Sequence, residues 1–473
     1  MLKSAQLTPI NYYPNSADWF LQIRHLAMPI WLDSGRPQSS YGRFDILSAS
    51  PAITLSTSGE FTQVRQNDSI TTSTENPFSL LQAYLPQTQA HLEQVPFCGG
   101  ALGYFGYDLG RRLEKLPESA VQDIALPDMN IGIYPWAIVQ DHQEMKAWLV
   151  INRALAPAYN FLEIEAICST AGQSTRFHDL KQDLKSASKP FKIMSFESNL
   201  KVGDYRNAIH KIQNYIAAGD CYQVNFAQRF SAEFEGDSFS AYLKLRETLP
   251  SPFSAYMEFA AGSVLSLSPE RFIKLDDRLA ETKPIKGTIA RGLTKEIDEA
   301  NALFLQSSLK DRAENLMIVD LLRNDLSKTC TDVQVPELFS LQSFANVHHL
   351  VSTVTGTLKP DMNALDLLAS SFPGGSITGA PKIRAMEIIE ELEPVRRSIY
   401  CGSIGYISAC GNMDTSITIR TLVCDKNKIY CWGGGGIISD SEADKEYQES
   451  IAKVKVLLDT LEQNFASSKQ NLR

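Results

Sequence analysis

The C-terminal part of the chain contains strand-like segments with only short turns between them. "SIGYISA" (403–409), "DTSITIRTLVCD" (414–425) and "KIYCWGGGG" (428–436) follow one another, and a helix is predicted from Ser441 to Phe465. Strands joined by short turns run antiparallel, because a parallel pair needs a long crossover connection. We therefore predict an α+β fold in which antiparallel sheets are flanked by helices.

The rest of the chain falls into two regions. Residues 1–190 mix strand-like runs such as "FDILSAS" (44–50) and "MKAWLVIN" (145–152) with turn-rich segments, and end in a polar, linker-like stretch (169–190). Residues 191–473 begin with an amphipathic helix (203–220) and a strand (221–234), and contain a long helical region (295–329), either one helix or two that meet near Lys310. The 473 residues allow two or three ordinary domains, or one large fold with two lobes.

Charge and composition exclude several classes of protein. The net charge is −9 and no long basic run is present, so we expect no nucleic-acid binding, which needs a clustered cationic surface. We expect neither a signal peptide nor a membrane span, because no apolar run is long enough. The eight cysteines form no Cys-x-x-Cys pair, which favours buried free thiols in a reducing cytoplasm over a zinc site.

The predicted last helix carries a row of charged residues on one face. Glu442, Glu446, Glu449 and Lys453 follow at spacings of four, three and four. Ser439 lies three residues before Glu442, so we assign Glu442 to a capping box. Glu446 and Glu449, beside a predicted four-glycine turn, suit a hard cation such as Mg²⁺. On this helix alone, a solvated face with a Glu449–Lys453 ion pair is the better interpretation.

A third carboxylate favours the metal site. Glu314 is followed at once by the apolar residues 316–319, and an unpaired charge in such a segment is expensive to bury. The alternative is a salt bridge to Arg312 or Arg323.

Other residues favour an anionic substrate. The glycine-rich segment "SFPGGSITGAPKIRAMEIIEEL" (371–392) leads into a helix, whose N-terminus attracts anions. It does not fit the nucleotide-binding phosphate loop, so a carboxylate is the better ligand. Arg420 and Lys453 could bind a carboxylate or form ordinary ion pairs. Lys286 follows Pro284 and precedes Gly287, so its loop holds the amine in a fixed place.

Together these segments resemble the chorismate-utilising enzymes. The resemblance rests on "GDCYQVNFAQRF", "SLSPERFI", "PIKGTIARG", "RAENLMIVDLLRNDLSK", "FPGGSITGAPK", "CGNMDTSITIRT" and "GGGGIISDSEADKEYQES", in order between about 200 and 455. It implies a large two-lobed antiparallel β-sandwich flanked by helices. Residues 1–190 would form an anthranilate-synthase-like region and residues 191–473 the chorismate-binding region.

The resemblance also implies roles for individual residues. Glu314, Glu446 and Glu449 would hold Mg²⁺, and Glu270 would protonate the departing C4 hydroxyl of chorismate, unless it merely pairs with Arg271. The implied substrate-binding residues are Gly287, Thr288, Tyr406, Arg420, Gly434, Gly435 and Lys453.

Lys286 decides the branch of the family. Relatives that form anthranilate or isochorismate carry alanine at this position. In the ammonia-using branch that makes 4-amino-4-deoxychorismate, a precursor of 4-aminobenzoate and folate, the lysine is the expected nucleophile. Gln223 replaces a lysine that activates water in water-using relatives, and His349 is found in both ammonia-using branches. The alternatives are anthranilate synthase component I and a catalytically silent homologue that serves as a scaffold.

The resemblance implies two further ligands. No cysteine lies in a Gly-x-Cys-x-Gly motif, so we find no glutaminase domain, and a separate glutamine amidotransferase subunit is expected to supply ammonia. "WLDSG" (31–35) and "PSPFSAY" (250–256) resemble a tryptophan pocket of the relatives, with Ser34 and Pro252 as candidate contacts. Plain packing in a β-core is the alternative for both residues.

Overall fold

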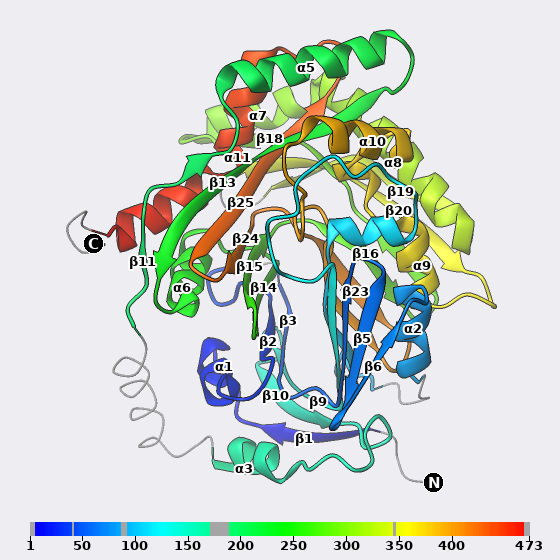
Figure 1. Cartoon of the computed structure of the whole chain (residues 1–473), viewed down its shortest axis with the longest axis vertical. Coiled ribbons are helices and arrows are strands. Elements are labelled where there is room, and N and C mark those ends of the chain that lie inside the picture. Colours follow the sequence, from blue (N-terminus) through cyan, green and yellow to red (C-terminus); the bar gives the residue numbers. More distant parts are fainter. Residues whose placement is uncertain (1–4, 40–41, 87–91, 171–188, 344–346, 468–473) are drawn as a thin grey trace.

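Two large sheets and the helices around them make up the protein (Figure 1). The structure is a computed structural model that describes residues 5–39, 42–86, 92–170, 189–343 and 347–467. Most of the predicted linker, 169–190, lies outside the described residues. The strands pair antiparallel throughout both sheets, which confirms the predicted fold class.

The first sheet has 13 strands. Its order is β1 (Gln6–Ile10), β10 (Lys146–Ile151), β9 (Trp136–Asp141), β3 (Phe44–Ser48), β2 (Ile30–Asp33), β14 (Phe253–Phe259), β15 (Gly262–Ser268), β24 (Thr421–Asp425), β25 (Lys428–Ile437), β13 (Gln223–Glu235) and β11 (Lys192–Ile193). The short strands β12 (Glu197–Ser198) and β21 (Gly379–Ala380) also pair with β13.

The second sheet has 12 strands. Its order is β18 (Ile285–Ala290), β20 (Val347–Leu358), β17 (Leu279–Thr282), β16 (Arg271–Asp276), β23 (Met413–Ile417), β22 (Ser403–Ser408), β7 (Gly100–Phe105), β8 (Met129–Tyr134), β4 (Ile53–Ser58), β5 (Phe61–Gln66) and β6 (Ser69–Ser73). Strand β19 (Cys330–Ser343) pairs with β20. Each sheet takes strands from both predicted regions, so the boundary at residue 190 divides the sequence but not the sheets.

Helices cover the outer sides of the sheets (Figure 1). They are α1 (Ala17–Ile23), α2 (Pro77–Tyr84), α3 (Leu162–Thr170), α5 (Val202–Ala217), α6 (Ser238–Thr248), α7 (Lys295–Ser307), α8 (Leu309–Thr329), α9 (Ala364–Ser371), α10 (Lys382–Leu392) and α11 (Ala443–Phe465), with short 3₁₀ helices η1 (Tyr107–Arg112) and η2 (Gly375–Ile377). The predicted helical region 295–329 is two helices, which meet at Ser308, and Ser308 caps α8 by accepting a hydrogen bond from Asp311 N.

Successive residues on central strands serve two different cores. Ile46 packs in the core between the sheets, and its neighbour Leu47 packs under the helices on the outer side of the first sheet. Met257 and Tyr256 divide in the same way, because side chains alternate along a strand. Burial on both faces explains why these strands are nearly continuously apolar.

The sequence pattern predicts that "DTSITIRTLVCD" forms one strand, and this is wrong. It divides into β23, which belongs to the second sheet, and β24, which belongs to the first. Arg420 lies between them in the left-handed region, with φ of 50°. The chain crosses from one sheet to the other at this residue, and apolar alternation on both sides of the crossing hides the break.

Two local predictions near the last helix are wrong. The four glycines 433–436 form no turn but continue β25 and pair with β13. The Ser439–Glu442 capping box is absent, since Glu442 is itself the N-cap and makes no side-chain capping bond. Ser441 instead bonds to Ile438 N and to Glu446 Oε1.

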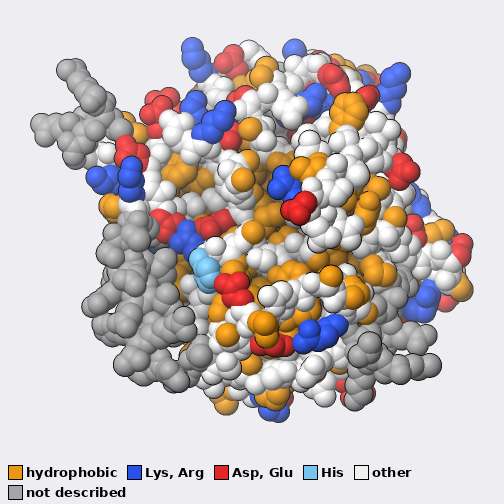
Figure 2. Space-filling view, turned by 60° about the horizontal axis from the view of Figure 1, so that its bottom comes forward, with side chains coloured by type: hydrophobic (Ala, Val, Ile, Leu, Met, Phe, Trp, Pro, Cys, Tyr) orange, Lys and Arg blue, Asp and Glu red, His pale blue; other side chains and the backbone are white. Residues whose placement is uncertain are grey.

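The cysteines are free thiols, as predicted, and seven of the eight are buried. Among the described residues, no helix combines the length and apolar character that a membrane crossing requires. Figure 2 shows charged side chains of both signs scattered over one face, with apolar side chains gathered near its middle.

A buried ion pair connects three segments around the centre of the molecule. Arg397 forms two hydrogen bonds to Glu393, at 3.0 and 2.6 Å, and also donates to the carbonyls of Ile377 and Asn225. Glu393 accepts a further bond from Ala227 N. The pair therefore fixes the glycine-rich loop, strand β13 and the end of α10 relative to one another.

Because both partners are buried, Arg397→Met should lower the free energy of unfolding by about 3–5 kcal/mol, leaving the Glu393 charge without a partner. The measurement is denaturant unfolding followed by tryptophan fluorescence. Arg323→Met is the matched control, since Arg323 pairs with Asp320 on the exposed face of α8 and should cost less than about 1 kcal/mol. Equal losses in the two variants would contradict the role given to the buried pair.

Candidate active site

Strand β18 presents Lys286 to helix α8. Lys286 Nζ donates to Glu314 Oε1 at 2.8 Å, and both side chains are largely buried. The following Gly287 has φ of 80°, and a Cβ there would lie 2.9 Å from Leu305 of α7, so glycine is required for this close approach. The alternative partners of Glu314 are excluded among the described residues, since Arg323 pairs with Asp320 and Arg312 stacks on Phe339.

The glycine strand β25 brings the other carboxylates to the same place. A Cβ at Gly435 would lie 3.3 Å from Glu446 Oε2 and 3.8 Å from Glu449 Oε1. A Cβ at Gly436 would lie 3.2 Å from Glu314 Oε1. The three predicted glutamates, one on α8 and two on α11, therefore border one short stretch of the β25 backbone.

The two glutamates of α11 differ in their ionisation. Burial raises the pKa of Glu446, and the neighbouring charge of Glu449 raises it further. Burial also acts on Glu449, but its ion pair with Lys453, at 2.8 Å, outweighs this and lowers the pKa of Glu449. Lys453 Nζ also donates to the carbonyl of Gly434 at 2.9 Å. The Glu449–Lys453 pair expected for a solvated face is thus formed, at the edge of the site.

Glu270 is a buried acid beside Lys286. Burial raises its pKa to about 7, although the charges of Lys286 and Arg420 act in the opposite direction. The adjacent Arg271 faces away and pairs with Asp414 and Glu281, so it is not the partner of Glu270. A carboxyl group with this pKa can carry a proton at neutral pH and release it.

Glu270 and Arg420 lie where the chain passes between the two sheets. Glu270 connects β15 of the first sheet to β16 of the second, and Arg420 connects β23 to β24 in the opposite direction. The two crossings are joined by backbone bonds from Ile417 N to Glu270 O and from Leu267 N to Arg420 O, both 3.0 Å. Among the described residues, the Arg420 side chain makes no ion pair or hydrogen bond, so it can bind an anion.

Thr288 and His349 form a neutral pair on neighbouring strands. Thr288 Oγ1 lies 2.7 Å from His349 Nδ1, across the β18–β20 pairing. Burial lowers the pKa of His349 to about 4, and the Arg420 charge adds to this. His349 is therefore uncharged at neutral pH and suited to orienting Thr288.

Sequence reasoning did not assign Ser376 and Ser441, which contact the acids. Ser376 Oγ lies 3.5 Å from Glu270 Oε1, and Ser441 Oγ donates to Glu446 at 2.7 Å. Both occur in segments already associated with the site, but nothing in a sequence pattern indicates which acid a serine contacts. The buried amide of Gln223 also faces the site, since its Nε2 would lie 2.2 Å from a Cβ at Gly436. Neither polar atom of that amide has a partner among the described residues.

The three glutamate carboxylates fit a hard divalent cation whose coordination is completed by a bound ligand. Carboxylate oxygens are the donors that Mg²⁺ prefers, and the two glutamates of α11 repel one another without a cation. Among the described residues, no three His, Cys, Asp or Glu side chains are close enough to hold a metal by themselves. Glu314 is engaged by Lys286 instead.

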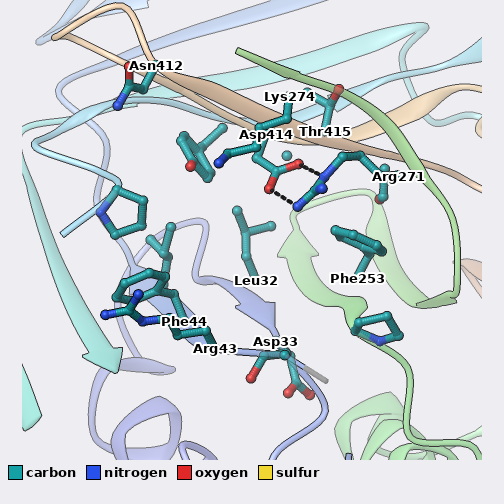
Figure 3. Close-up of a pocket in the computed structure, with 18 of the residues that line it drawn as sticks. Leu32, Asp33, Arg43, Phe44, Phe253, Arg271, Lys274, Asn412, Asp414 and Thr415 are labelled. Carbon is teal, nitrogen blue, oxygen red and sulfur yellow. Dashed lines mark hydrogen bonds and ion pairs between the residues drawn. The ribbon is translucent and has the colours of Figure 1, made fainter. Parts of the chain in front are cut away.

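Tyr406, predicted to bind substrate, lies in a different place. It lines a cavity of about 470 Å³ between the sheets, together with Ser34 and Pro252. Figure 3 shows this cavity, with the Arg271–Asp414 ion pair on one side and Asp33 and Phe44 on the other. The Ser34 hydroxyl already donates to Asp45. The apolar run of β22 predicts that Tyr406 is buried, but it does not indicate that Tyr406 lies away from Lys286.

Comparisons with known proteins agree with this geometry. Residues 29–459 match the chorismate binding enzyme family. Aminodeoxychorismate synthase component 1 of Escherichia coli is 48% identical over 94% of this chain and 95% of its own. The protein of that name from Salmonella typhimurium is 45% identical over 98% of this chain and 100% of its own.

A solved structure has the same fold. Anthranilate synthase component I of Streptococcus pneumoniae superposes with a TM-score of 0.77 at 32% identity, over 89% of this chain and 93% of that one. The family match over residues 29–459 includes Glu314, Glu446 and Glu449. This chain belongs to the family of chorismate binding enzymes.

Proposed function

We propose that the protein makes 4-amino-4-deoxychorismate from chorismate and ammonia, for 4-aminobenzoate and folate synthesis in the cytoplasm. The observation that carries the proposal is the position of the Lys286 amine, 2.8 Å from Glu314 and in the field of the buried acid Glu270. Relatives of this activity at 45–48% identity support it.

The reaction needs two displacements. Lys286 first loses a proton, and Glu314 is within reach to accept it. The neutral amine then attacks C2 of chorismate, the ring double bonds shift, and the C4 hydroxyl departs. Glu270 supplies the proton with which that hydroxyl leaves as water. Ammonia then attacks C4, the double bonds shift back, and the lysine leaves C2. The net reaction replaces hydroxyl by amine and releases one water.

Cationic and hydroxyl side chains around the site would bind the substrate carboxylates. The Arg420 guanidinium is the first candidate, and the Lys453 amine and the Thr288 hydroxyl are the others. Glu314, Glu446 and Glu449 would hold Mg²⁺, which supplies positive charge opposite a chorismate carboxylate.

Two further ligands belong to this proposal. Ammonia would come from a glutamine amidotransferase subunit, since the similar proteins are called component 1. Tryptophan is the proposed occupant of the cavity lined by Ser34 and Pro252, whose mixture of apolar and charged walls suits an amino acid with a large ring.

The deciding experiment is mass spectrometry of the product formed from chorismate, Mg²⁺ and ammonium at alkaline pH. The proposal requires a product that keeps the enolpyruvyl group and exchanges hydroxyl for amine. Anthranilate and pyruvate would instead favour the second candidate, anthranilate synthase, whose pneumococcal example shares the fold.

Lys286→Ala should reduce turnover at least 100-fold, because the covalent step is lost, and should change the dissociation constant of chorismate less than tenfold. Lys286→Arg should be as inactive, since it keeps the charge near Glu314 but not the nucleophile. Steady-state kinetics and calorimetric titration separate the two effects. Lys283→Ala, which breaks only a pair with Glu281, is the control. Full activity of Lys286→Arg would remove the nucleophile assignment.

Glu270→Gln should lower the single-turnover rate by about 10²–10⁴-fold, because the amide cannot give a proton to the leaving hydroxyl. With a pKa of about 7, Glu270 is protonated below that pH, so the wild-type rate at constant free ammonia should fall as the pH rises through 7. The variant should lack this decrease. If the decrease persists in Glu270→Gln, another group is the acid.

Glu314→Ala should abolish Mg²⁺-dependent turnover, because the variant loses a carboxylate ligand of the metal. Titration of activity with Mg²⁺ is the measurement, and Asp320→Ala is the control on the same helix, because Asp320 pairs only with Arg323 at the surface. An unchanged Mg²⁺ titration in Glu314→Ala would leave Glu314 with its salt bridge to Lys286 alone.

A further inference from the structure

Exposed apolar side chains are concentrated in one short stretch of the chain. Of the 17 large apolar residues exposed among the described residues, six fall within residues 293–316. We call them the α7–α8 apolar surface: Leu293, Ile297, Leu303, Phe304, Leu309 and Leu316. Scattered single exposures are normal for a folded protein, but such a concentration is not.

Helix α7 exposes three of its four large apolar side chains, alongside its charged residues. Asp298 faces inward, bonding to Arg291, to Gly292 N and to His348, and Asn301 donates to the carbonyl of Ala290. Leu305 is the only buried residue of α7. Ile297, Leu303 and Phe304 share the other side of the helix, where Phe304 is 67% exposed. A surface helix of a monomer normally turns its apolar side chains toward the core.

Helix α8 continues the exposed apolar residues. Leu309, Ala313 and Leu316 follow at spacings of four and three and lie on its outer face, opposite the buried Ile318 and Leu322. The six residues are 46% to 100% exposed and together present several hundred Å² of largely apolar surface, which is on the order of the largest patch of a typical monomer. This is a substantial part of the roughly 800 Å² that one partner contributes to a stable interface.

The inner side of the same two helices carries the chemistry. Helix α7 packs on β18 and β20, which hold Lys286, Thr288 and His349, and Leu305 contacts Gly287. Helix α8 carries Glu314. A protein bound to the outer side would therefore lie one helix away from the amine that ammonia must displace.

We propose that the α7–α8 apolar surface is the docking site of the subunit that supplies ammonia. This rests on the proposed function, which requires ammonia at C4 of chorismate next to Lys286. A subunit bound here could deliver it to the site without release into water. An apolar surface of this size is typical of a contact with another protein. Its position beside the strand that carries Lys286 favours the subunit that supplies ammonia as that protein.

The test compares two double variants of the full chain. Ile297→Glu with Phe304→Glu places two charges in the proposed interface. Phe61→Glu with Ile70→Glu is the matched control, since these residues are 55% and 54% exposed on β5 and β6, at the opposite edge of the sheet from β18. Each is assayed with ammonium alone and with glutamine plus the glutamine amidotransferase subunit of the same organism.

We expect the α7 variant to keep its ammonium-driven rate within twofold and to lose at least 20-fold of its glutamine-driven rate at low partner concentration. Excess partner should restore the loss, and the control should keep both rates. Equal glutamine-driven rates in the two variants would overturn the proposal. So would sedimentation in which the chain alone forms a dimer that the α7 charges dissociate while partner binding is unchanged.

If the charged variant does not fold, Phe304→Ser with Leu303→Ser replaces it, and the dissociation constant of the partner is measured by calorimetry. A tenfold or greater weakening supports the docking site, and an unchanged constant overturns it. Failure of the proposed function is a separate result, because the wild-type chain would then make no aminodeoxychorismate even from ammonium.

Discussion

The site depends on a strand that has no side chains at the point where charged groups meet. At Gly435 and Gly436 the backbone of β25 lies close to carboxylates from α8 and α11, and a Cβ at Gly436 would collide with the Gln223 amide. Because β25 is paired with β13 by its backbone, this close approach is fixed by the sheet and does not rely on flexible loops. A rigid element can bury a carboxyl group next to a like charge, and both burial and the neighbouring Glu449 raise the pKa of Glu446.

The two sheets supply the second constraint. Glu270 and Arg420 occupy neighbouring crossings of the chain between the sheets, where the strands end and side chains can face the space between them. Residues at such crossings are buried, but their side chains do not have to alternate between two faces as they do along a strand. Burial is what raises the pKa of Glu270 to about 7, so the fold itself produces an acid suited to neutral pH.

On the proposed function, Lys286 distinguishes this chain within a shared architecture. A pneumococcal anthranilate synthase component has the same fold at 32% identity, so the sheets and helices alone do not determine the product. In this chain the amine on β18 is paired with a carboxylate that is also a proposed metal ligand. On the proposed function, the chemistry of the branch lies in this one side chain on a shared frame, and helix α7, which packs on the strand that carries it, has the outer face proposed for a partner.

The sequence by itself determined the antiparallel α+β class and several of the strands and helices, which follow from local periodicity and need no knowledge of distant contacts. It also indicated Lys286, Glu270, Glu314, Glu446 and Glu449 as candidate site residues, through motifs and the family resemblance. Only the tertiary structure decided that "DTSITIRTLVCD" is divided between two sheets, that the four glycines are a strand, and that Tyr406 lines a cavity to which Lys286 does not contribute. It also decided that Glu314 pairs with Lys286 and not with an arginine of its own helix. The physical reason is that a strand pattern reports only that a residue is buried, whereas the neighbour it is buried against depends on which strands pair across hundreds of residues.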